Sequence, residues 1–111
     1  MDSIKRGDLV TVALQGDFGK PRPALVIQSD LFNEQHATVT VLPITSHIIG
    51  SPLFRITLEP SEQNGLRNVS QIMVDKVVSV KRDKIGPPFG RLNDEILVRV
   101  NRAMAVWLGM V

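Results

Sequence analysis

Short apolar runs rich in β-branched residues, separated by prolines and glycines, constrain the fold of this chain more than any other feature. We expect strands at 8–14, 24–27 and 38–42, because each run is short and has a breaker close by. Residues 54–58 alternate between apolar and polar and predict a further strand, and 71–80 predicts the next. The chain is therefore expected to consist mainly of β-sheet.

Helical periodicity is clear only near the C-terminus. Asn93 is the expected N-cap, and the carboxylates of Asp94 and Glu95 in the first turn favour the positive end of the helix dipole. One apolar stripe then contains Ile96, Leu97, Val100, Ala103, Met104, Trp107 and Leu108, and we expect core packing to account for all of it. Strands followed by one terminal helix predict a mainly β (α+β) fold, a small antiparallel β-barrel capped by a C-terminal α-helix.

The composition limits both the size of the protein and its chemistry. A chain of 111 residues, 43% of them hydrophobic, is expected to form a single domain over residues 1–111. It has no cysteine and two histidines, so we expect no disulfide, no metal site and no cofactor. Neither a signal-like N-terminus nor a membrane-length apolar run occurs, which predicts a soluble cytoplasmic protein without membrane contact.

Positive charge is concentrated in one part of the sequence. The formal net charge of the chain is +2, whereas residues 67–91 carry six basic residues against two acidic ones, a net +4. Two interpretations are open, a solvated basic face or an electrostatic track for a phosphate backbone.

Two segments contain side chains suited to phosphate chemistry. Arg22 lies between two prolines just before an expected strand, and a guanidinium matches phosphate oxygens at any working pH. Thr45 and Ser46 end another expected strand. A surface arginine and a turn-capping hydroxyl are the alternatives. His47 follows Ser46, but neighbours in an extended segment point to opposite faces and no carboxylate is evident to orient the histidine, so a triad is disfavoured.

In this order, five segments resemble the MazF/PemK toxin family over nearly the whole chain: 5–10 (KRGDLV), 19–27 (GKPRPALVI), 42–46 (LPITS), 70–76 (SQIMVDK) and 90–92 (GRL). The resemblance implies an SH3-like barrel of the CcdB/MazF type that forms a homodimer. It also implies metal-independent cleavage of single-stranded RNA by attack of the ribose 2′-hydroxyl. The partners implied are a cognate antitoxin and, only through the antitoxin complex, operator DNA.

The resemblance also implies roles for particular residues. Arg22 matches the arginine that acts on the scissile phosphate, Thr45 matches its hydroxyl partner, and Asp75 matches the strand carboxylate that serves some members as general base. The RNA-binding residues expected beside them are Phe18, Lys20, Ser46, Gln71 and Lys76. An aspartate of ordinary pKa is a poor base for a ribose hydroxyl at neutral pH, so the role of Asp75 is open.

Two departures from the family pattern concern the second catalytic cation. Met73 and Val78 occupy positions where many members have arginine.

Two alternatives to an RNA-cleaving toxin follow. One is a gyrase poison of the CcdB type, which shares the fold and whose chain also ends in a helix closing on a tryptophan and a glycine, here Trp107 and Gly109. The other is a degenerate member that binds nucleic acid or antitoxin without cutting. For the dimer, we expect the apolar loop residues Ile48 and Ile49 to contribute.

Overall fold

The computed structural model describes residues 3–14 and 20–111, so Phe18 lies outside the described residues. Within these ranges the chain forms the following elements, in order: β1 (Asp8–Ala13), β2 (Pro21–Val26), β3 (Thr38–Thr45), β4 (Arg55–Leu58), β5 (Ser70–Met73), the 3-10 turn η1 (Val74–Lys76), β6 (Val78–Lys81), the 3-10 turn η2 (Arg82–Lys84), β7 (Gly90–Arg91) and α1 (Asp94–Trp107).

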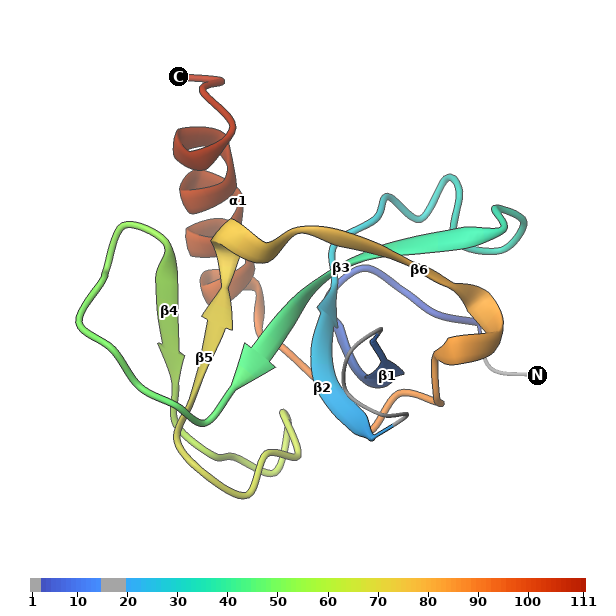
Figure 1. The fold of residues 1–111 in the computed structure, drawn as a ribbon, viewed down its shortest axis with the longest axis horizontal. Coiled ribbons are helices and arrows are strands. Elements are labelled where there is room, and N and C mark those ends of the chain that lie inside the picture. The colour runs from blue at the N-terminus through green and yellow to red at the C-terminus, as the bar shows by residue number, and fades with distance from the viewer. Residues whose placement is uncertain (1–2, 15–19) are drawn as a thin grey trace.

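The strands form one curled antiparallel sheet in the order β4-β5-β3-β2-β1-β7, and β6 adds to β3 (Figure 1). A bridge between Val12 of β1 and Ile85 brings the chain after β6 back against β1. The predicted antiparallel barrel with a C-terminal helix is thereby confirmed, in the form of a curled half-barrel. No helix in the described ranges is long and apolar enough to cross a membrane.

The central strands are buried on both faces, which explains why their apolar runs are continuous. Leu9 and Leu25 belong to the core cluster that Leu97 and Val100 of α1 also join. Their strand neighbours on the opposite face, such as Val10, belong to a second cluster inside the curl of the sheet. A sheet enclosed on both sides requires apolar residues at successive positions instead of alternate ones.

The predicted strand at 71–80 was wrong in one respect, because two strands separated by η1 occupy this segment. Residues 38–41 of β3 pair with β6, whereas Ile44 and Thr45 pair with β5. Pro43 lies between the two paired stretches and has no N–H to donate. The partner of β3 therefore changes from β6 to β5 at Pro43, a residue that could not donate a backbone hydrogen bond to either strand.

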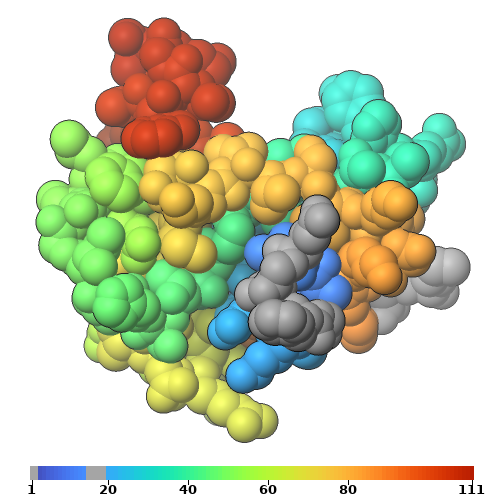
Figure 2. All heavy atoms as spheres, viewed as in Figure 1, coloured from blue at the N-terminus to red at the C-terminus, as the bar shows by residue number. Residues whose placement is uncertain are grey.

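The helix begins as predicted, but its last turn is not packed as predicted. The Asn93 side chain accepts a hydrogen bond from the Ile96 N–H and so caps α1. Trp107 is 50% exposed and touches the body through Phe54, whose ring centroid is 5.8 Å away, and Leu108 is 53% exposed. Figures 1 and 2 show the reason: the end of α1 projects beyond the sheet, where no core is left to cover it.

Candidate functional site

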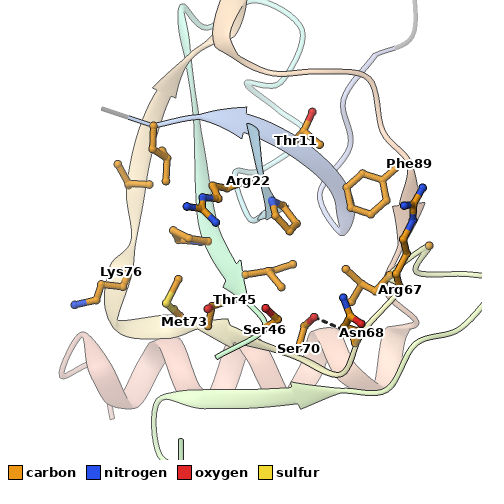
Figure 3. Close-up of a pocket in the computed structure, with 17 residues that line it drawn as sticks. Thr11, Arg22, Thr45, Ser46, Arg67, Asn68, Ser70, Met73, Lys76 and Phe89 are labelled. Atoms are coloured by element: carbon orange, nitrogen blue, oxygen red, sulfur yellow. Dashed lines mark hydrogen bonds between the residues drawn. The ribbon is translucent and has the colours of Figure 1, made fainter. Parts of the chain in front are cut away.

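A cleft of about 830 Å³ opens where β3 leaves β2 (Figure 3). β2 pairs with β3 only through residues 24–26, and the last residues of β3 turn to β5 instead. The two strands therefore diverge, and side chains from both of them line the space. The lining residues are Thr11, Leu14, Arg22, Pro23, Pro43, Ile44, Thr45, Ser46, Gly65, Leu66, Arg67, Asn68, Ser70, Met73, Lys76, Val78 and Phe89.

Arg22 is exposed and reaches into this cleft from β2. The sequence suggested a position just before the strand, but the strand includes Arg22 and both flanking prolines. At Pro21 and Pro23 the strand pairs with β1 but not with β3. The backbone N–H groups that the two prolines lack are therefore not needed for a ladder with β3. A rigid strand therefore holds the guanidinium.

Thr45, the last residue of β3, presents its hydroxyl on the same cleft (Figure 3). Its Oγ1 accepts a hydrogen bond of 3.1 Å from the His47 N–H, which leaves the hydroxyl hydrogen available for an acceptor in the cleft. Ser46 follows and is exposed on the cleft wall. His47 is not among the lining residues, which agrees with the rejection of a serine-histidine pair.

Lys76 and both departures from the family pattern also border the cleft. The Lys76 side chain is 59% exposed, and its Nζ lies 3.7 Å from Asp75 Oδ2. Met73 and Val78 line the wall, so these two positions are apolar. Lys20 is exposed at the start of the described segment, but it is not a lining residue.

Two of the expected site residues do not face the cleft. Gln71 is only 3% exposed, and other protein groups occupy its side-chain amide, so it is not presented to the cleft. Asp75 is not a lining residue, and its side chain is 15% exposed. Its Oδ1 is buried without a hydrogen-bond partner among the described residues. A general-base role for Asp75 therefore has no geometric support.

Sequence reasoning missed the other end of the cleft, where Arg67, Asn68 and Phe89 lie (Figure 3). Phe89 is 38% exposed. Gly65 has a positive φ of 69°, and a Cβ there would lie 2.6 Å from the Phe89 carbonyl oxygen, so only glycine lets the loop lie this close. The sequence had included Arg67 only as the first residue of the basic segment 67–91, and it gave no signal that Asn68 and Phe89 border a site.

The basic segment 67–91 does not form one continuous track. Arg67 and Lys76 line the cleft, but Arg91 forms an ion pair of 3.0 Å with Asp8, and Arg82 donates to the His36 carbonyl. The positive charge at the cleft therefore comes from Arg22 together with two residues of the segment. Among the described residues, no group of three His, Cys, Asp or Glu side chains is arranged to hold a metal ion.

Comparison with known proteins supports the family resemblance. Residues 5–108 match the family described as PemK-like, MazF-like toxin of type II toxin-antitoxin system. A protein of Mycolicibacterium smegmatis named probable endoribonuclease MazF is 44% identical over 108 residues, covering 96% of this chain and 98% of that protein.

Solved structures give the same result for the fold. A mycobacterial endoribonuclease in complex with its cognate antitoxin superposes with a TM-score of 0.83 at 19% identity, covering 98% of each chain. The MazE-MazF structure (Form-II) from Deinococcus radiodurans has a TM-score of 0.80 at 26% identity, and the match covers 100% of both chains.

These matches do not favour the gyrase-poison alternative. With a family match that runs from the first strand to the last turn of the helix, the chain belongs to the PemK-like, MazF-like toxins of type II toxin-antitoxin systems.

Proposed function

We propose that this toxin is an endoribonuclease that cleaves single-stranded RNA in the cleft between β2 and β3. The observation that carries the proposal is the convergence of Arg22 and Thr45, from two strands, on one cleft. A guanidinium and a hydroxyl donor together suit a phosphodiester whose negative charge increases in the transition state. The endoribonuclease names of the relatives agree with this chemistry.

In the proposed reaction, the ribose 2′-oxygen attacks the adjacent phosphorus and the bond from phosphorus to the 5′-oxygen breaks. The 2′-hydroxyl loses its proton and the departing 5′-oxygen gains one, so the products are a 2′,3′-cyclic phosphate and a 5′-hydroxyl. Arg22 donates to the phosphate oxygens, Thr45 adds a neutral donor, and Ser46 is an auxiliary one.

The described lining residues include no histidine and no carboxylate. We therefore assign most of the rate enhancement to electrostatic stabilisation of the phosphorane-like transition state, and none of it to Asp75 as a base. Lys76 adds positive charge at the same end of the cleft. Lys20 and Phe18 remain proposals for the approach to the site, since neither is a described lining residue.

Unpaired bases suit the far end of the cleft. Phe89, which is 38% exposed, offers an aromatic ring for stacking, and base stacking on an aromatic ring contributes about 1 to 3 kcal/mol. Arg67 and Asn68 present donors beside it that can hydrogen-bond to a base edge. A base in a duplex is already stacked and paired, so this arrangement favours single-stranded RNA.

A cognate antitoxin is the protein partner we propose, since two structural neighbours were solved with theirs. An acidic antitoxin segment over the cleft would neutralise Arg22, Arg67 and Lys76, and its affinity should therefore fall as salt rises. An affinity unchanged between low and high salt would point to apolar docking instead. Contact with operator DNA is proposed only through the antitoxin complex.

A homodimer is proposed on the basis of apolar side chains that the single chain leaves exposed. Ile48 in the loop after β3 is 46% exposed, and on the last turn of α1 and beyond it the exposed residues are Val106, Trp107, Leu108, Met110 and Val111. Burying such side chains against a two-fold copy removes them from water. Sedimentation at micromolar concentration tests this, and a strictly monomeric species would contradict it.

The decisive experiment is incubation of the purified protein with a long single-stranded RNA in excess EDTA, followed by analysis of the product ends. We expect cleavage to 2′,3′-cyclic phosphate and 5′-hydroxyl ends. RNA that stays intact, with or without added divalent ions, would contradict the proposed function. Cleavage that needs a metal would contradict the mechanism while leaving the ribonuclease activity standing.

A further inference from the structure

Gln71 is buried directly beneath the loop that follows Thr45, and its side-chain amide is fully used. The amide oxygen accepts from the Ile49 N–H at 3.1 Å and from Arg55 Nη1 at 3.1 Å. The amide nitrogen donates to the Ile49 carbonyl at 2.9 Å and to Thr57 Oγ1 at 3.1 Å. Two acceptor and two donor positions are therefore all satisfied, and Gln71 holds both polar groups of the Ile49 backbone.

Arg55 connects this cluster to the residue next to the site. Its Nη1 also donates to the His47 carbonyl, at 3.2 Å. The His47 N–H in turn donates to Thr45 Oγ1 at 3.1 Å. A continuous path of hydrogen bonds and one loop backbone thus leads from β5 and β4 to the hydroxyl that faces the cleft.

The direction of the Thr45 hydroxyl depends on this path. One acceptor position of Oγ1 is occupied by the His47 N–H, so the hydroxyl hydrogen is excluded from that direction and is left to donate to an acceptor elsewhere, such as one bound in the cleft. If the loop moves, the His47 N–H moves with it and this restriction is lost. A misplacement of about 1 Å at a reacting centre can cost about 100-fold in rate.

We infer that Gln71 and Arg55 are positioning residues that hold the Thr45 hydroxyl in its donating direction through the loop backbone at His47 and Ile49. The inference rests on the proposed function, because it needs Thr45 to act on RNA. It also gives a physical role to a glutamine that the sequence placed among the RNA contacts. Gln71 acts from beneath the loop, since a side chain only 3% exposed does not reach a substrate.

The test is a double-mutant cycle with Gln71→Met and Thr45→Val, measured as kcat and KM on one RNA substrate. Methionine has nearly the shape of glutamine and none of its hydrogen bonds. We expect Gln71→Met to lower kcat by about 10- to 100-fold with KM within about twofold. In the Thr45→Val background the same change should lower kcat by less than about threefold, because the hydroxyl it positions is already gone. Gln35→Met, at an exposed glutamine outside the cleft, is the matched control and should match the wild type.

A second pair of variants covers the case in which Gln71→Met does not fold. Arg55→Met removes the bond to the His47 carbonyl, whereas Arg55→Lys keeps a cation able to donate there, so kcat should fall in the first and recover at least partly in the second. Independent, multiplying effects of the Gln71 and Thr45 changes would overturn the inference, as would an unchanged kcat in Gln71→Met or Arg55→Met. If the wild type itself leaves RNA intact, the proposed function fails, and that outcome is distinct from a failed cycle.

Discussion

Replacing Arg22 by alanine is the sharpest test of the proposed chemistry, because it removes the one cation that β2 presents to the cleft. Losing one preorganised donor to a charge that develops in the transition state typically costs about 100- to 1,000-fold in rate, or about 2.7 to 4 kcal/mol. We expect kcat on RNA to fall by that factor in Arg22→Ala. Single-turnover cleavage of a labelled RNA measures it directly.

Stability should change little in the same variant. Arg22 is exposed, so its removal opens no cavity in the core, and surface substitutions usually fall within about 0.5 kcal/mol. The thermal midpoint, followed by circular dichroism, should therefore stay near that of the wild type. A large drop would mean that lost folding, not lost chemistry, explains any loss of activity.

Arg22→Lys is the matched control for the charge. Lysine keeps the positive charge but lacks the planar fork that binds two phosphate oxygens at once, so we expect activity between those of the wild type and the alanine variant. Cleavage by Arg22→Ala at the wild-type rate, with its fold intact, would refute the assignment of the cleft between β2 and β3 as the catalytic site.

Four further predictions follow from the fold and the cleft. Asp75→Asn should keep kcat within about threefold, because Asp75 does not line the cleft, and a loss above 100-fold would restore it as a base. Phe89→Ala should raise KM by about 5- to 150-fold with a smaller effect on kcat, as expected for a lost stacking contact of about 1 to 3 kcal/mol; an unchanged KM would exclude the ring as a base platform. Gly90→Ala should lower the thermal midpoint strongly, since its Cβ would lie 2.1 Å from the Asn64 carbonyl oxygen, and a midpoint at the wild-type value would contradict that contact. Leu108→Asp should shift sedimentation toward monomer, and an undisturbed dimer would move the interface away from the end of α1.

Much of the fold could be read from local patterns. Continuous apolar runs identified the central strands because a sheet buried on both faces leaves no polar position, and Asn93 identified the start of α1 because its side chain satisfies an end N–H that would otherwise lack a partner. Such features depend on neighbouring residues only, so the sequence is sufficient to reveal them. Arg22 and Thr45 were candidates from their places at the ends of expected strands, but only the family resemblance paired them in one site.

Which side chains of residues 71–76 line the cleft was decided by tertiary structure alone. A single strand over 71–80 would place Gln71, Met73 and Asp75 on one face, because side chains alternate along a strand. Instead, the chain enters η1 after Met73, where β3 changes its partner, and this turn brings Lys76 to the cleft while leaving Asp75 outside its lining. Local propensity did not reveal the turn, because its cause is the pairing of β3 with two different strands.

The far end of the cleft and the end of the helix depended on distant contacts in the same way. Phe89 borders the cleft because Gly65, from another segment, lets a loop lie against it, and the apolar stripe of α1 is buried only as far as the sheet extends beneath it. The sequence by itself determined most of the strands, the start of the helix and which side chains are chemically capable. Only the tertiary structure decided which of them share a cleft, because that depends on where strands exchange partners and where the core ends.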